Sequence, residues 1–265
     1  MTEGTVLALH NVNTYRGQAH VLRHVSLAVH SGETVCLVGR NGAGKTTTME
    51  TLMGLLPVRS GDVSYHGREI TATAPHVRAR LGIGYARDDA GIFPDLTVAE
   101  HLRIGVWLAG TSEGASADGR GASRRPRSSS GRRSSSRDKD DAGRHRDAID
   151  ELFPELQRLM SRKGLHLSGG EKKMVAIARA MSLLPSVLLL DEAFEGLAPI
   201  VVNRFADAVR KIKGMGISML IAESNVASAA KVADRLYVID RGEIIFHGTP
   251  ADVFANESVM QTIRG

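Results

Sequence analysis

The stretch TVCLVGRNGAGKTT, residues 34–47 of this 265-residue chain, decides the class of fold. Its first five residues form an apolar, β-branched run that is typical of a buried strand. The residues from Gly39 to Thr46 then fit the pattern G-x-x-x-x-G-K-S/T at every position, and a helical stretch follows at 46–56. In this arrangement the backbone N–H groups of the loop turn towards a phosphate, and the helix presents its N-terminus to the same anion. The stretch therefore predicts a site for a nucleoside triphosphate.

The residue types in this loop indicate what each would bind. Lys45 supplies a mobile positive charge for the outer phosphates, and the hydroxyl of Thr46 can ligate Mg²⁺. We expect the nucleotide to contact Gly39, Asn41, Gly42, Ala43, Gly44, Lys45, Thr46 and Thr47.

An acidic pair, Asp191 and Glu192, follows the apolar run at 187–190. A carboxylate at the end of such a strand suits the second metal-binding position of a triphosphate site, and the next one can polarise an attacking water. Taken alone, the pair could equally cap the following helix. Together with the phosphate loop it favours Asp191 as a metal ligand and Glu192 as the catalytic group.

Strand-like and helix-like runs alternate along the chain. We expect strands at 34–38, 81–85, 187–190, 217–222, 236–239 and 243–246, and helices at 46–56, 98–108, 145–160, 168–181, 200–212 and 227–232. This alternation predicts an α/β fold, a P-loop NTPase core with a mostly parallel sheet. Runs at 6–12, 25–29 and 62–66 predict an N-terminal antiparallel β subdomain. Capping boxes at 97–100 and 168–171 mark two helix starts.

The positive charge of the chain is confined to one segment. The whole chain has a formal net charge of +5, and residues 111–146 contain ten Lys/Arg against five Asp/Glu, so the remainder is neutral. This segment is rich in Ser, Gly and Arg, and without apolar periodicity it cannot offset the entropy of ordering, so we expect a disordered insertion. Because no basic face is expected on the fold, nucleic acid is an unlikely partner.

Three further features concern the compartment. Cys36 is the single cysteine, which excludes an internal disulfide and favours a reducing environment. The first ten residues do not resemble a secretion signal, and the apolar runs are far shorter than the ~20 residues of a membrane-spanning helix. Any role at a membrane is therefore expected to depend on a partner.

The sequence LSGGE at 167–171, between the phosphate loop and LLLLDE, resembles the signature of ABC ATPases. This resemblance implies that two chains pack head to tail and enclose two ATP molecules, with Ser168, Gly169 and Gly170 gripping the nucleotide of the other subunit. It also implies that Tyr15 stacks on adenine, that Glu192 is the catalytic glutamate, and that residues 195–198 form a loop joining the two sites. The resemblance covers the chain apart from the insertion.

A narrower resemblance rests on NGAGKT at 41–46, MGLL at 53–56, GIFP at 91–94, ELFP at 151–154 and GLAPI at 196–200. These motifs are similar to those of the ATPases of branched-chain amino acid importers, in particular the shorter of their two types. The ATPases of urea or short-chain amide importers share much of the pattern. The resemblance implies an ATP-hydrolysing motor bound to membrane permeases at the cytoplasmic face of the cell membrane, without direct contact with the solute.

Two positions depart from the family pattern. Asp88 stands where many ABC ATPases have Gln in a loop that senses Mg²⁺, and Ser224 stands where a His usually contacts the γ-phosphate. Serine is shorter and cannot carry positive charge, so we expect it to reach the phosphate only through water. We therefore expect reduced hydrolysis at the site built on this chain and a heterodimer in which the partner ATPase does most of the work.

The resemblance divides the chain into three expected parts. Residues 1–86 form the N-terminal part of the ATPase core, residues 87–165 an α-helical subdomain that carries the insertion, and residues 166–265 the signature helix with the rest of the core. A different class, a soluble ABC ATPase acting on ribosomes or DNA, usually has two cassettes or a long coiled coil, and neither is present here. A role of the Arg/Ser segment in binding RNA or acidic lipid is disfavoured because the segment has no aromatic residues.

Overall fold

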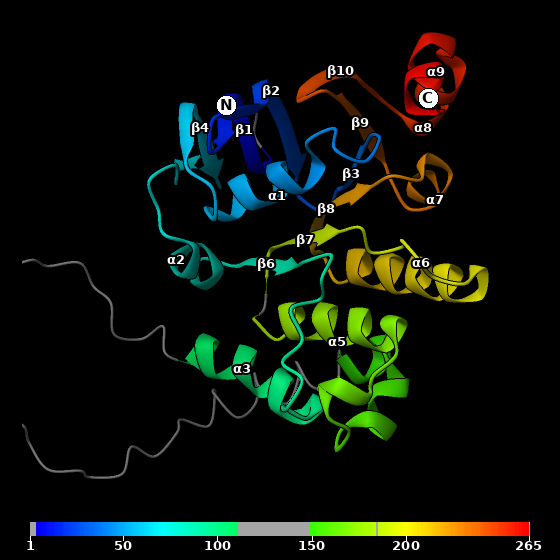
Figure 1. Ribbon diagram of the computed structural model, residues 1–265. Coiled ribbons are helices and arrows are strands. Elements are labelled where there is room, and N and C mark those ends of the chain that lie inside the picture. Colours follow the sequence, from blue (N-terminus) through cyan, green and yellow to red (C-terminus); the bar gives the residue numbers. More distant parts are fainter. Residues whose placement is uncertain (1–3, 111–148, 184, 265) are drawn as a thin grey trace, which may run out of the picture.

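The computed structural model describes residues 4–110, 149–183 and 185–264 (Figure 1). Its centre is a six-stranded sheet in the order β10-β9-β3-β8-β7-β6. The strands are β3 (Thr34–Val38), β6 (Ile83–Ala86), β7 (Val187–Asp191), β8 (Ser218–Glu223), β9 (Arg235–Asp240) and β10 (Glu243–Gly248). Neighbouring strands are parallel except for β10, which is antiparallel to β9. The predicted α/β fold with a mostly parallel sheet is confirmed.

The apolar strands are buried because both faces of this sheet are covered. In β3, Cys36 and Val38 belong to one core, whereas Val35 and Leu37 belong to a second core on the opposite face. Side chains alternate between faces along a strand, so an uninterrupted apolar run requires a layer on each side. Helices α5 (Gly169–Met181) and α6 (Pro199–Gly214) supply the first layer, and α1 (Lys45–Met53) belongs to the second.

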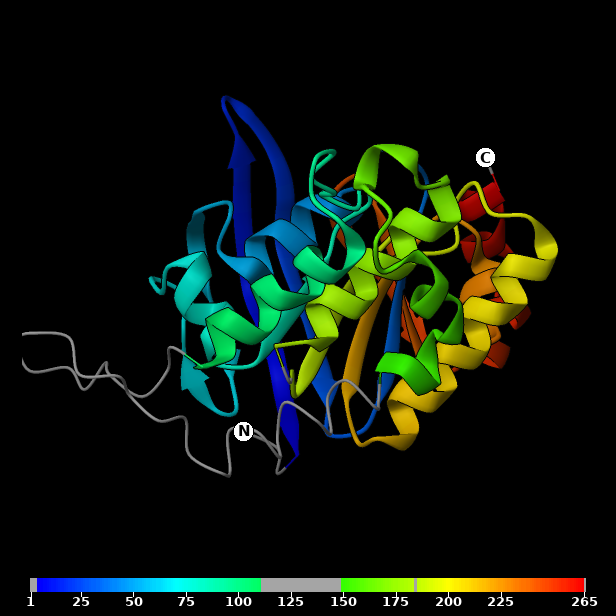
Figure 2. The same ribbon diagram turned by 90° about the horizontal axis from the view of Figure 1, so that it is seen from below.

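The N-terminal sheet is antiparallel, as predicted, in the order β2-β1-β4-β5. Its strands are β1 (Thr5–Arg16), β2 (Ala19–His30), β4 (Val58–Tyr65) and β5 (Arg68–Glu69). Strands β1 and β2 are much longer than the runs expected from the sequence. Figure 2 shows these two strands (blue) extending through most of the height of the molecule beside the helices. Their inner side chains share the second core with α1.

A helical layer covers the end of the molecule near β6. It contains α3 (Val98–Gly110), residues 149–152, the 3₁₀ helices η2 (Pro154–Leu159) and η3 (Gly164–His166), and α5. The expectation of one continuous helix over 145–160 is wrong at Phe153, because a residue before proline is driven out of the helical region and the chain resumes as a 3₁₀ helix. The capping box at 97–100 is confirmed, with the Thr97 N–H donating to Glu100 at 2.7 Å. The expected insertion at 111–146 lies outside the described residues.

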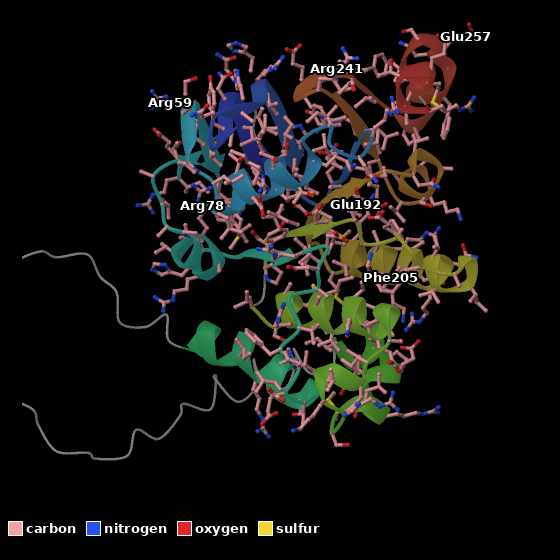
Figure 3. All side chains as sticks on the ribbon, in the orientation of Figure 1. Arg59, Arg78, Glu192, Phe205, Arg241 and Glu257 are labelled. Carbon is pink, nitrogen blue, oxygen red and sulfur yellow. The ribbon has the colours of Figure 1, made fainter. Side chains whose placement is uncertain are left out.

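Several short helices were not expected from the sequence. They are α2 (Pro75–Arg80), α8 (Pro250–Ala255) and α9 (Glu257–Arg264), while α7 (Val226–Ala230) matches the run expected at 227–232. Arg78 of α2 is buried, and its guanidinium donates to the carbonyls of Thr51 and Leu52 at the end of α1 (Figure 3). None of the helices in the described part of the chain is long and apolar enough to cross a membrane.

Candidate active site

The phosphate loop leaves β3 at Val38 and becomes α1 at Lys45. A side chain on Gly39 would place its Cβ 2.2 Å from the Ile239 carbonyl oxygen, so only glycine fits there. Gly44 has a φ of 116°, a conformation that side chains rarely adopt, and it caps α1 without a side chain. Because no side chain caps this helix, the N–H groups of its first turn are available to an anion.

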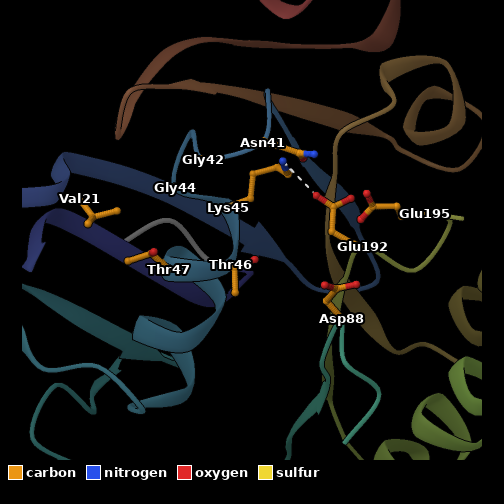
Figure 4. A pocket seen from close by; sticks show the side chains of 10 residues that line it. All are labelled: Val21, Asn41, Gly42, Gly44, Lys45, Thr46, Thr47, Asp88, Glu192 and Glu195. Carbon is orange, nitrogen blue, oxygen red and sulfur yellow. Dashed lines mark ion pairs between the residues drawn. The ribbon is translucent and has the colours of Figure 1, made fainter. Parts of the chain in front are cut away.

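A cavity of about 360 Å³ lies against this loop (Figure 4). Its lining combines the loop and α1 with the ends of neighbouring strands. The residues are Val21, Asn41, Gly42, Gly44, Lys45, Thr46, Thr47, Asp88, Glu192 and Glu195. Six of the eight predicted contacts from the phosphate loop line this cavity, whereas Gly39 and Ala43 do not. Asp88 and Glu192 reach the same cavity from distant segments of the chain. Val21 is a member that the sequence patterns did not single out, whereas Glu195 belongs to the loop at 195–198 that the resemblance placed between the two sites.

Lys45 is the buried cation of this cavity, with 4% of its side chain exposed. Its Nζ donates to the carbonyls of Gly39 at 2.9 Å and Arg40 at 3.1 Å, and it forms an ion pair with Glu192 at 3.0 Å (Figure 4). A buried charge is costly without such partners, so the ammonium is held by this chain's own acceptors. A phosphate entering the cavity would compete with Glu192 for it.

Ser224 lies between Lys45 and Glu192. Its Oγ accepts from Lys45 Nζ at 2.9 Å and lies 2.8 Å from Glu192 Oε1 and 2.7 Å from Asn41 Oδ1, two alternative acceptors for its one proton. Its backbone N–H donates to the other Glu192 oxygen at 3.1 Å. A serine at this position therefore binds directly to both charged groups of the site, whereas its expected contact with phosphate through water stays a prediction.

Asp191 lies at the end of β7 beside the loop. Thr46 Oγ1 donates to one of its oxygens at 3.3 Å and Tyr85 donates to the other at 3.2 Å. Burial raises the pKa of Asp191 to about 6 against the lowering effect of these two hydrogen bonds. Tyr85 did not stand out in the sequence, although its place at the end of a strand parallel to β7 could have indicated this contact.

The oxygen donors near Asp191 fit Mg²⁺. A carboxylate and the Thr46 hydroxyl lie together, and Asp88 reaches the same cavity from the loop after β6. The described residues contain no group of three or more His, Cys, Asp or Glu side chains that could hold a metal ion by themselves. Magnesium at triphosphate sites commonly uses one or two carboxylates and takes its other ligands from phosphates and water, so the donor set suits a metal that arrives with the nucleotide.

Glu192 has a φ of 49°, in the left-handed region that costs a residue with a side chain about 1–2 kcal/mol. Its N–H donates to Ala222 O at 2.9 Å, in β8. The neighbouring Glu223 is buried and accepts from Phe194 N–H at 2.7 Å. The pKa of Glu223 is raised to about 8, chiefly by burial; the hydrogen bond from Phe194 opposes this rise and the nearby Glu192 adds to it. In this left-handed conformation the Glu192 carboxylate forms its ion pair with Lys45.

Tyr15 lies on a second cavity, of about 940 Å³, with residues 16–18 and 56–59. Its ring is stacked on His20, with ring centres 4.4 Å apart and planes 6° from parallel. Arg16 connects the two cavities, because its Nε donates to Thr47 Oγ1 at 3.2 Å. The proposed adenine-stacking ring is therefore separated from the phosphate cavity by one arginine side chain.

The signature residues Ser168, Gly169 and Gly170 are absent from the lining of both cavities in the part of the chain that the structure describes. They begin α5, and the predicted capping box is confirmed: Ser168 N–H donates to Glu171 at 2.7 Å and Glu171 N–H donates back to Ser168 Oγ at 3.3 Å. Ser168 and Gly169 are exposed. The structure therefore separates the two phosphate-binding patterns.

Comparison with known proteins agrees with this geometry. The family model described as ABC transporter matches residues 22–195. The chain is 33% identical over 260 residues to the high-affinity branched-chain amino acid transport ATP-binding protein BraG of Pseudomonas aeruginosa, covering 98% of this chain and 100% of that protein. It is also 33% identical over 263 residues to the lipopolysaccharide export system ATP-binding protein LptB of Escherichia coli, covering 98% of this chain and 97% of that protein.

Among solved structures, the ADP conformation of MJ1267, an ATP-binding cassette of an ABC transporter, has a TM-score of 0.77 and 26% identity, covering 98% of this chain and 99% of that one. The dimeric bacterial cassette MJ0796, at 21% identity and a TM-score of 0.73, covers 92% of this chain and 98% of that one and shares the fold. The chain belongs to the ABC transporter family, and within it the chain is an ATP-binding ATPase.

Proposed function

We propose that this chain is the motor subunit of an ABC importer for branched-chain amino acids. The observation that supports the motor role is the pairing of Lys45 with Glu192 in the phosphate-loop cavity, beside the Thr46–Asp191 contact. Phosphoryl transfer to water requires a cation that binds phosphate, a carboxylate beside it and oxygen donors for a metal.

In this proposal the residues of the cavity act in fixed roles. The N–H groups of the loop and of the first turn of α1 bind phosphate oxygens. Lys45 leaves Glu192 for the outer phosphates, and the released carboxylate orients the attacking water. Thr46, Asp191 and Asp88 would hold Mg²⁺, which supplies charge neutralisation at the phosphates when bound. Tyr15 stacks on adenine beside Arg16.

A second ATPase chain completes the site in this proposal. Ser168–Gly170 do not line the described cavities of this chain, and Ser168 and Gly169 are exposed, which suits a nucleotide held by a partner in a head-to-tail pair. MJ0796, which has this fold, is dimeric. Ser224 and Asp88 reduce hydrolysis at the site of this chain, so the pair is a heterodimer whose other ATPase is faster. The pair binds permeases at the cytoplasmic face of the membrane.

The division of labour can be tested in cells. We expect Glu192→Gln to lower transport less than the equivalent substitution in the partner ATPase, because the partner's site does most of the work. The measurement is initial uptake rate at equal expression of each variant. Equal losses from both substitutions would contradict a slow site on this chain.

The solute is the finer part of the proposal. The hypothesis of an amino acid importer is supported by the motifs at 196–200 and 151–154 and by the full-length similarity to BraG. Lipopolysaccharide export is a second candidate, because LptB is equally similar, and urea or amide import is a third. The test is to delete the gene in its own cell, restore it with wild type or Lys45→Ala, and measure uptake of labelled leucine, urea and a short amide together with surface lipopolysaccharide. We expect only wild type to restore leucine uptake; restoration of lipopolysaccharide export instead would overturn the importer.

A further inference from the structure

Lys173 joins the signature helix to the loop that carries Glu192. It lies two residues after the capping box of α5, and its Nζ donates to the backbone carbonyls of Glu192, in a short contact, and Glu195, at 2.9 Å. These two carbonyls bracket the segment 192–195, and both residues line the phosphate cavity. One ammonium group thus fixes the loop from the side of α5.

This contact acts on a strained residue. The positive φ of Glu192 persists only if the surroundings over-determine it. Its N–H is held by Ala222 in β8, its carboxylate by Lys45 and Ser224, and its carbonyl by Lys173. The contact to the carbonyl comes from α5, the helix that Ser168 caps and Gly169 begins.

We propose that Lys173 is a positioning residue that couples the position of the signature helix to the catalytic orientation of Glu192. A shift of the first turn of α5 moves Lys173, and the two carbonyls move with it, because a charged donor bound to two acceptors resists separation from them. The carboxylate of Glu192 then changes its place at the phosphates. The inference rests on the proposed function only in assigning a nucleotide to Ser168–Gly170. The hydrogen bonds from Lys173 to the Glu192 and Glu195 carbonyls lie within one chain.

The adjacent Lys172 provides a matched control. It has the same charge and lies on the same helix, and its side chain makes no hydrogen bond or ion pair with any described residue in the structure. Lys173→Met removes the two donors while keeping an unbranched side chain of similar length, and Lys172→Met makes the same change without touching the loop.

The experiment measures single-turnover ATP hydrolysis by the purified full chain in excess over ATP, and the affinity for a fluorescent ATP analogue. We expect Lys173→Met to slow hydrolysis on the order of 10-fold, because displacement of a catalytic group by about 1 Å is costly. The affinity should stay within about 2-fold, and Lys173→Arg should recover part of the rate. Lys172→Met should change neither quantity.

A double-mutant cycle tests whether Lys173 acts through Glu192. In a Glu192→Gln background, Lys173→Met should cause little further loss, since the group that it positions is already gone. An undiminished rate in Lys173→Met, or the same fold-loss with and without Glu192, would overturn the proposal. Lys173→Gln replaces Lys173→Met if the latter does not fold, with the same expectations. If Lys45→Ala also leaves nucleotide binding and hydrolysis intact, the failure lies instead in the proposed function.

Discussion

The two helix starts that resemble phosphate sites, those of α1 and α5, differ in how their free N–H groups are used. At α1 the preceding residue is Gly44, which has no side chain, and Lys45 is buried against the chain's own acceptors. At α5 the capping box of Ser168 and Glu171 satisfies donors within the chain, and Ser168 and Gly169 are exposed. The start of α1 thus lies at a cavity within this chain, whereas the start of α5 is capped by its own side chains and lines neither described cavity.

This difference has an energetic basis. A side-chain cap contributes roughly 1 kcal/mol to the stability of a helix. The start of α5 obtains this contribution from its own sequence, while the start of α1 leaves its donors to whatever anion enters the cavity. Substitutions at the two starts should therefore separate binding from stability.

The largest effect is expected when the α1 site loses its cation. Lys45→Ala should lower ATP hydrolysis on the order of 10³-fold and weaken nucleotide affinity, because the buried charge that faces the phosphates is removed. The measurements are steady-state phosphate release and equilibrium binding. Lys172→Ala, which removes a lysine outside both cavities, should retain both activities. Wild-type hydrolysis in Lys45→Ala would show that α1 is not the site.

Glu192→Gln should give the next largest change. We expect hydrolysis to fall on the order of 10²-fold, since the amide cannot act as a base. Nucleotide affinity should be retained or improved, because Glu192 would no longer compete with phosphate for the Lys45 ammonium. Equilibrium dialysis measures the nucleotide affinity separately from the hydrolysis rate. A parallel loss of affinity and rate would indicate a structural rather than a catalytic role.

Ser168→Ala should affect α5 without touching the site at α1. The lost cap should lower the free energy of unfolding by about 1 kcal/mol and the melting temperature by roughly 2–4 °C. The affinity of a single chain for ATP should not change, because Ser168 does not line its cavity. Hydrolysis should fall only at protein concentrations where two chains associate. The measurement is the hydrolysis rate over a series of protein concentrations. A weaker affinity at low protein concentration would contradict the separation of the two starts.

The smallest effect concerns pH. The pKa of Glu223 is raised by burial to about 8 from an ordinary value of 4.5, so the folded chain binds this proton more tightly than the unfolded chain. The resulting stability is complete below about pH 4.5 and is lost as the pH rises through about 8. Glu223→Gln should flatten the fall in unfolding free energy between about pH 5 and about pH 9. Identical slopes for the variant and wild type would show that Glu223 is not protonated.

Local patterns predicted much of the fold. The run at 34–38 and the acidic end of the run at 187–190 lie on central strands, and both capping boxes begin helices where expected. The patterns failed to give the bounds of elements that depend on pairing with another strand or on an adjacent proline. The run at 81–85 became β6 (Ile83–Ala86), and β1 and β2 were extended by pairing with each other beyond their apolar runs. Proline at 154 broke a run whose apolar residues otherwise suited a helix.

The phosphate loop after a buried strand could be predicted from the sequence, because that pattern depends on residues adjacent in the chain. The structure was needed to show that Lys45 pairs with Glu192 and that Ser224 contacts both. It was also needed to show that Tyr85 donates to Asp191 and that Lys173 donates to the Glu192 carbonyl. These contacts join segments separated by many residues. Their distances follow from strand order and register, which cannot be predicted from the local pattern of residues.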